Sequence, residues 1–403
     1  MSKRAIVVIF ACFCCIFISF AVRYAYGLLL PYMLPDLDIT KAQAGTIYSA
    51  YFFAYMLFSP ILGVLVDRFD ARLILTLFIG LLGLGTLLMA FADSLLLASL
   101  SFGLAGLGQS AGWVPVITLV QRWVSERRRG TAIAVVDLGS ATGIVVVSLA
   151  IPVVVGALNW QRAWICLGIL GLMVAVLNFF AISNPPAYGS EGRSSRSPSA
   201  NPTLFQAYGQ VMGQPAFWLI GISYALIAFC ILIPFAFLTA YATLGLNISY
   251  RSAALLIGVV ALTGICGKLS LGHLSDNIKR VYVMILCGIL TCAGNLGLAL
   301  AQSFWGLICF AALFGIGYGA IWPVYGAAAR DYFQQEFAGR IIGLWTLFLG
   351  VGSIVSPVLA GWMVDVSGRY MWAFILAAAA ALLSAAMLVP VLGMKSMQFD
   401  SGN

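Results

Sequence analysis

The chain has 403 residues, of which 62% are hydrophobic and only 8% are charged, whereas about a quarter of a typical soluble domain is charged. Its mean hydropathy is +1.03, and this excludes a soluble globular protein. The net charge of +8 comes from cations that lie between apolar stretches rather than on one solvated face, so it does not indicate nucleic-acid binding.

Twelve apolar runs are long enough to cross a bilayer, and they cover residues 5–34, 41–66, 72–92, 94–121, 130–158, 162–183, 215–244, 252–275, 281–301, 304–329, 338–364 and 370–394. The segment between the sixth and seventh runs is rich in Ser, Pro and Gly, which predicts a flexible linker. We therefore predict an all-α membrane protein with two six-helix bundles, at 1–183 and 214–403, joined by a linker at 184–213.

The cations are distributed unevenly between the two sides of the predicted membrane. Fifteen of the 21 Lys and Arg residues fall on the side that holds both chain ends, and four fall on the other side. By the positive-inside rule, both termini are expected in the cytoplasm. We expect a monomeric, multi-pass protein of a bacterial inner (plasma) membrane.

The two halves repeat each other at an offset of 209 residues. This offset superposes "GVLVDRFDAR" (63–72) on "GHLSDNIKR" (272–280), which share the pattern Gly-x-Leu-x-Asp, and "GLGQSAGW" (106–113) on "GIGYGAIW" (315–322). Coincidences in one register indicate duplicated halves. Six-helix halves of this kind, with a substrate site between them near the bilayer midplane, are typical of transporters.

Over nearly its full length the sequence resembles the transporters of the major facilitator superfamily. The first of these segments resembles the loop that, in this family, holds the cytoplasmic gate closed. Asp70 and Ala71 stand where a second Gly and a further cation are usual, so we expect a weaker gate. The alternative is that the arginines only set the topology. The gate residues implied by the resemblance are Gly63, Asp67, Arg68, Arg72 and, in the second half, Asp276.

Three ionisable residues lie within predicted spans: Arg23, Asp137 and Lys268. An arginine at mid-bilayer costs about 2.5 to 3.5 kcal/mol, so each such residue is a candidate for function. Ser19 and Tyr26 share the helical face of Arg23, and this face is expected to line the substrate path. The alternative for Arg23 is a structural role, bonded to carbonyl groups of a neighbouring helix.

Asp137 and Lys268 each lie eight residues, or about 12 Å, from the same end of their spans. The family resemblance implies that the fifth and eighth spans pack across the two halves, which would allow these residues to form an ion pair. Protonation of Asp137 would break the pair and bias a two-state equilibrium. The alternatives are a Lys268 that reaches the interface and an Asp137 that stays neutral among backbone donors.

The segment "GKLSLGHLSD" (267–276) resembles the eighth span of monocarboxylate transporters and of oxalate/formate antiporters, in which a cation at the place of Lys268 binds the substrate carboxylate. This sequence differs from those two families at two places. Gly264 stands where animal monocarboxylate carriers have an Asp, and the eleventh span lacks the second cation of the oxalate exchangers. Arg23 falls within about one residue of the first-span lysine of monocarboxylate carriers.

The charges and the aromatic residues together indicate the size and charge of the substrate. Arg23, Lys268 and Asp137 sum to +1, which a single carboxylate would neutralise. An apolar wall with a few polar groups suits a small organic acid, although aromatic stripes also occur as plain packing. The further candidates for substrate binding are Tyr26, Tyr51, Tyr55, Gln109, Tyr318 and Trp322.

The sequence therefore predicts a secondary transporter of small organic anions that works by alternating access. We expect proton-coupled transport of a lactate- or pyruvate-like monocarboxylate, held by Arg23 and Lys268, with Asp137 responding to protons. Anion exchange is the first alternative, followed by drug efflux and a transporter-like sensor. We find no Walker, HExxH or nucleophile-elbow motif, so we expect no enzyme activity, no cofactor and no metal. The expected partners are the anion, protons and the lipid bilayer.

Overall fold

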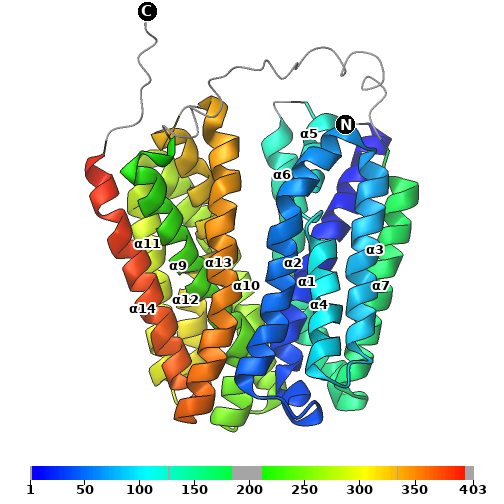
Figure 1. Ribbon diagram of the computed structural model, residues 1–403, viewed down its shortest axis with the longest axis vertical. Helices are drawn as coiled ribbons and strands as arrows, with labels where there is room; N and C mark the ends of the chain where they lie inside the picture. The colour runs from blue at the N-terminus through cyan, green and yellow to red at the C-terminus, as the bar shows by residue number, and fades with distance from the viewer. Residues whose placement is uncertain (1, 126–127, 184–210, 334, 395–403) are drawn as a thin grey trace, which may run out of the picture.

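The computed structural model describes residues 2–125, 128–183, 211–333 and 335–394, and within these ranges twelve helical segments are long and apolar enough to cross a membrane. Figure 1 shows them as two neighbouring groups, α1 to α7 and α9 to α14. The helices of the first group are α1 (Lys3–Asp36), α2 (Lys41–Arg68), α3 (Ala71–Met89), α4 (Leu95–Gln109), α5 (Val114–Trp123), α6 (Arg129–Ala157) and α7 (Trp160–Ala181). Those of the second group are α9 (Pro215–Ala240), α10 (Tyr250–Asn277), α11 (Arg280–Leu300), α12 (Phe304–Tyr332), α13 (Gln335–Ser367) and α14 (Met371–Leu388).

The repeat predicted from the sequence is visible in the turns that follow the first helix of each half. Asp38, after α1, and Asn247, after α9, both have positive φ values, of 48° and 55°. They are separated by the same 209 residues as the repeated motifs. Because Asp and Asn tolerate this left-handed conformation better than other non-glycine residues, the two halves reverse direction by the same local chemistry.

Three helix pairs join the two halves: α1 with α9, α2 with α13, and α6 with α10. The third pair is the expected packing of the fifth span against the eighth. At the first pair the backbones approach closely, since a Cβ atom on Gly27 would lie 1.9 Å from the carbonyl oxygen of Phe235. Only glycine fits there without moving a helix.

Two sets of hydrogen bonds hold the halves together at one end of the bundle. We call the end that holds Lys3 and Met394 the terminal end, and the opposite one the far end. At the far end the Tyr250 hydroxyl donates to the carbonyl of Leu28 at 2.8 Å. The Asp365 carboxylate of α13 accepts from the backbone N–H groups of Lys41 at 3.1 Å and Ala42 at 2.8 Å. The ribbons of α2 and α13 diverge toward the terminal end, so the halves are closed at the far end (Figure 1).

The sequence predicted the fourth span as one continuous run over 94–121. In the structure this span is broken into two helices, α4 and α5. Helix α4 ends at Gln109, the N–H of Gly112 donates to the carbonyl of Gln109 at 2.7 Å, and α5 begins at Val114 with Pro115 in its first turn. A glycine that favours the turn and a proline that favours a helix start explain the break. Its equivalent in the second half, α12, is continuous. The seventh span is longer than α9 and ends in a π-helical turn at Tyr241–Gly245.

Candidate functional site

Arg23 of α1 is surrounded by aromatic rings from α1 and α2. Its guanidinium carbon lies 5.0 Å from the ring centroid of Phe20, 5.6 Å from Tyr51, 5.3 Å from Phe52 and 5.4 Å from Tyr55. Ring faces stabilise a cation by about 0.5 to 2 kcal/mol each, but they do not neutralise it. Within the described residues Arg23 forms no ion pair, and its buried Nε has no hydrogen-bond partner. Arg23 is therefore a half-buried cation without an acidic partner in the described part of the chain, and its charge would attract an anion.

Beside Arg23, helix α2 and the broken fourth span are joined by a hydrogen bond. The Tyr51 hydroxyl donates to Oε1 of Gln109 at 3.1 Å, and both side chains are buried. This contact depends on close helices, since a Cβ atom on Gly106 would lie 2.1 Å from the carbonyl oxygen of Tyr51. Gln109 is the last residue of α4, so its amide lies at the break.

The second half supplies more aromatic residues. The Tyr318 hydroxyl of α12 lies 3.3 Å from the Tyr24 hydroxyl of α1, a hydrogen bond across the halves. Trp322 packs edge-on against Tyr318 at 6.4 Å and against Tyr224 at 5.8 Å. Tyr55, Tyr224 and Trp322 are only half-buried, so part of their surface is free to contact a substrate.

Tyr26 does not join this group. Its ring is stacked between those of Tyr48 and Phe102, with both centroids at 5.0 Å. Its hydroxyl donates to the carbonyl of Ala44 at 2.6 Å, and its side chain is 1% exposed. We therefore assign Tyr26 to packing among α1, α2 and α4, and we withdraw it as a candidate for substrate binding. Arg23 and Tyr26 are three residues apart on α1, and their side chains contact different neighbours.

Asp137 and Lys268 form an ion pair between α6 and α10, as the resemblance implied. The Lys268 side chain is 35% exposed and that of Asp137 is 19% exposed, so neither charged group is fully enclosed by protein. The Asp137 carboxylate also lies 3.4 Å from the Ser140 hydroxyl, a weak contact. Because this pair joins the two halves, its charge state affects how the halves are held together.

The structure does not bring Arg23 and Lys268 to one point. Arg23 lies 20 residues, or about 30 Å along the helix, from the terminal end of α1. Asp137 and Lys268 lie only about 12 to 14 Å from the terminal ends of α6 and α10. Lys268 also has its own partner. The site therefore has two centres: a cation deep in the bundle with no acidic partner in the described part of the chain, and a neutral pair nearer the terminal end.

Part of the predicted gate motif can be examined. The surroundings of Gly63 and the side chains of Asp67 and Arg68 lie outside what the structure describes. Arg72 is described, and its guanidinium carbon lies 5.3 Å from the ring of Phe179. Asp276 is 71% exposed and lies 3.8 Å from Arg280, which is also paired with Asp331. Exposed pairs of this kind contribute about 0 to 1 kcal/mol.

Several residues of the site were not identified from the sequence. Tyr24, Phe20 and Phe52 surround the cation or bond across the halves, and Tyr224 completes the second aromatic cluster. An aromatic residue in a membrane helix gives little signal, because the helix is apolar on every side and has no single buried face. The glycines and the proline in "GLGQSAGWVP" (106–115) were the available signal for the break that holds Gln109.

Twelve spanning helices in two repeated halves, with charged side chains held between them, define an integral multi-pass membrane transporter. The chain belongs to the Major Facilitator Superfamily, whose family model matches residues 12–281 and 241–396. Membership in this family makes the protein a transporter and not an enzyme.

Curated relatives and a solved structure agree with this assignment. The chain is 25% identical to a hexuronate transporter of Bacillus subtilis, over 97% of this chain and 96% of that protein. It is 25% identical to monocarboxylate transporter 12-B of Danio rerio, over 88% of this chain and 80% of that protein. An inward-facing bacterial homologue of the human lysosomal transporter Spinster has the same fold, with a TM-score of 0.76, 15% identity and coverage of 97% and 96% of the two chains.

Proposed function

We propose that the protein transports small organic monoanions, and that it couples the uptake of a lactate- or pyruvate-like monocarboxylate to protons. The observation that carries this proposal is the state of Arg23, a half-buried cation among four rings with no acidic partner within the described residues. A carboxylate could accept two parallel hydrogen bonds from its guanidinium. The names of the hexuronate and monocarboxylate relatives support an organic acid as substrate.

The charge count favours one negative charge on the substrate. Asp137 and Lys268 neutralise each other, so Arg23 alone remains. One carboxylate neutralises it, whereas a dianion would leave an uncompensated charge in a region of low dielectric constant, which is costly. We therefore assign carboxylate binding to Arg23 and give Lys268 the role of partner to Asp137.

We infer from the lining an apolar organic acid rather than a polyhydroxylated one. The groups nearest Arg23 are rings, and the Gln109 amide oxygen and the Tyr24 hydroxyl already have partners, which leaves the buried hydroxyls of Ser19 and Tyr48 as the free ones. A sugar acid would bring several hydroxyl groups that need hydrogen bonds, and each buried hydroxyl without a partner costs about 1 to 3 kcal/mol. The half-buried faces of Tyr55, Tyr224 and Trp322 offer apolar contact instead.

Proton coupling is assigned to Asp137. Protonation would remove its negative charge, free Lys268 and weaken the contact between α6 and α10. A change of this kind shifts the balance between two arrangements of the halves. We further assign the terminal end to the cytoplasm, from the excess of cations on that side, so that the described state is inward-facing.

The test uses purified protein in liposomes and measures uptake of labelled lactate, with and without an inward proton gradient and with unlabelled carboxylates preloaded. We expect uptake that a proton gradient accelerates, and competition by pyruvate at about tenfold lower concentration than by glucuronate. Uptake that requires a preloaded anion would show exchange. If correctly folded protein takes up neither lactate nor pyruvate under any condition, the monocarboxylate assignment is wrong.

A further inference from the structure

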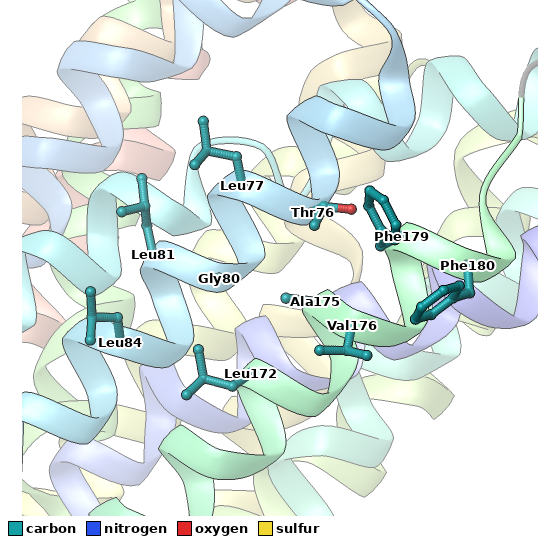
Figure 2. A pocket seen from close by; sticks show the side chains of 10 residues that line it. All are labelled: Thr76, Leu77, Gly80, Leu81, Leu84, Leu172, Ala175, Val176, Phe179 and Phe180. Atoms are coloured by element: carbon teal, nitrogen blue, oxygen red, sulfur yellow. The ribbon is translucent and has the colours of Figure 1, made fainter.

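An apolar groove lies on the outside of the first half, between α3 and α7. Its volume is about 520 Å³ (Figure 2). Leu77 and Leu84 of α3 and Val176 and Phe180 of α7 form part of its walls, and all four are exposed on the outer surface. Because both helices span the membrane, this groove faces lipid and not water.

Small residues create the groove beside a tight helix contact. At Gly83 the helices touch, since a Cβ atom there would lie 2.7 Å from the backbone nitrogen of Leu172. One turn closer to the terminal end, a Cβ atom on Gly80 would lie 3.8 Å from the Cβ atom of Ala175, which is an ordinary contact. A methyl group therefore fits at position 80, whereas a leucine would occupy the groove.

Polar groups meet the groove only near its terminal end. Arg72 is in the first turn of α3, and its guanidinium carbon lies 5.3 Å from the ring of Phe179, which lines the groove. Within the described residues no ion pair involves Arg72, and its buried Nε has no hydrogen-bond partner. The buried hydroxyl of Thr76, one turn further along, also has none. Asp70 is close, but its carboxylate accepts from the backbone N–H of Arg72 at 2.8 Å.

The length of the groove matches one leaflet of a bilayer. From Arg72 to Leu84 the helix rises about 18 Å, and half of a hydrocarbon core is about 15 Å. An apolar channel of this length that ends in a cation without an acidic partner among the described residues fits one acyl chain with a phosphate at its end. Most cations of the chain lie on the same side as Arg72, which favours a negatively charged headgroup.

We propose that the α3–α7 groove binds one anionic phospholipid of the leaflet at the terminal end, with an acyl chain along Gly80 and the phosphate on Arg72. The site is separate from the Arg23 centre and goes beyond the proposed transport. The conclusion that this leaflet is the cytoplasmic one rests on the orientation assigned under the proposed function. The proposal that a lipid binds in the groove does not depend on that orientation.

The experiment is native mass spectrometry of the full-length protein, titrated in detergent with phosphatidylglycerol or with phosphatidylethanolamine. We expect one tightly bound phosphatidylglycerol per chain and weaker binding of phosphatidylethanolamine. Arg72→Gln is expected to weaken phosphatidylglycerol binding about tenfold, as the loss of a charge-assisted hydrogen bond would. Gly80→Leu is expected to weaken binding of both lipids, because it fills the groove while Arg72 remains.

Two matched variants serve as controls. Arg162→Gln removes an exposed cation in the first turn of α7 at the far end, and Gly156→Leu adds the same side chain at an exposed glycine of α6 with open space around it. Both are expected to bind lipid as the wild type does. The proposal is overturned if Arg72→Gln and Gly80→Leu, each monodisperse and helical, bind phosphatidylglycerol as tightly as these controls. It is also overturned if the wild type carries no lipid and Gly80→Leu converts a dimer into a monomer, because a second copy then fills the groove. Either result leaves the transport proposal untouched, since no transport is measured.

Discussion

At the scale of single residues, Arg23 differs from every other cation within the described part of the chain, because it is deep in the bundle and has no acidic partner there. Four rings lower the cost of its burial without removing the charge. Arg23 can therefore remain charged in the empty protein and still attract an anion.

Replacement of Arg23 tests this role directly. Arg23→Gln is expected to weaken binding of the transported carboxylate about 100-fold, because it removes a bidentate charged contact worth roughly 3 kcal/mol. Arg23→Lys is expected to retain part of the affinity, since it keeps the charge but loses the planar geometry. Calorimetric titration of purified protein provides the measurement. A Gln variant that binds as tightly as Arg162→Gln would rule out Arg23 as the carboxylate site.

Removal of the Asp137 charge separates coupling from binding. Asp137→Asn is expected to abolish the acceleration of uptake by a proton gradient, because the group that takes the proton is gone, while exchange of bound anions continues. The single variant leaves Lys268 without its counter-charge and is expected to unfold at a lower temperature. The double variant Asp137→Asn/Lys268→Gln is expected to recover that stability but not the proton response. Gradient-driven uptake by the double variant would contradict the assignment.

At the scale of elements, the far end is closed by side chains of one half that form hydrogen bonds with backbone atoms of the other half. The N-terminus of α2 is bonded to Asp365 of α13, and Lys41 adds its ammonium group at 3.7 Å from the same carboxylate. A carboxylate at a helix N-terminus is favoured by the exposed N–H groups and the helix dipole. This contact must break before the halves can separate at the far end.

Asp365→Ala is expected to shift the protein toward a form that is open at the far end. The variant loses two charge-assisted hydrogen bonds, which corresponds to roughly a tenfold change in the ratio of the two forms. Spin labels at Leu158 and Leu300, both exposed near the far end, would report this change as a larger population of long distances in double electron–electron resonance. Asp93→Ala, an exposed carboxylate at the same end, is the control. Identical distance distributions in the two variants would contradict the role of Asp365.

The spans and the repeat could be predicted from the sequence, but the orientation of the helices about their axes could not. Runs of apolar residues locate the spans to within a few residues, because a bilayer sets a minimum length. Lipid-facing and protein-facing sides are equally apolar, so nothing in the sequence shows that Tyr26 packs in the core while Tyr55 remains half-buried. Arg23, Asp137 and Lys268 were identified because charge is costly in a membrane. The depths of Arg23 and of the ion pair follow from counting residues along the helices, whereas the rings around Arg23 depend on packing and needed the structure.

At the scale of the whole molecule, the excess of cations at the terminal end predicts the direction of insertion. A green fluorescent protein fused after Asn403 is expected to fluoresce in bacterial cells, because it folds in the cytoplasm. Alkaline phosphatase fused after Leu37, in the far-end turn, is expected to be active, because it requires the opposite compartment. The reverse pair of results would invert the orientation, and with it the assignment of the described state as inward-facing.

Under the proposed mechanism, the charges of Arg23, Asp137 and Lys268 also determine how the transporter responds to the membrane potential. The empty protein carries Arg23, Lys268 and Asp137, a total of +1. With one carboxylate bound at Arg23 and one proton on Asp137 the total is again +1, so both moving forms carry equal charge. A potential acts on net charge movement by about 2.3 kcal/mol per charge per 100 mV. One-to-one symport would therefore be electroneutral. The ratio of substrate concentrations that it reaches across the membrane would not depend on the membrane potential.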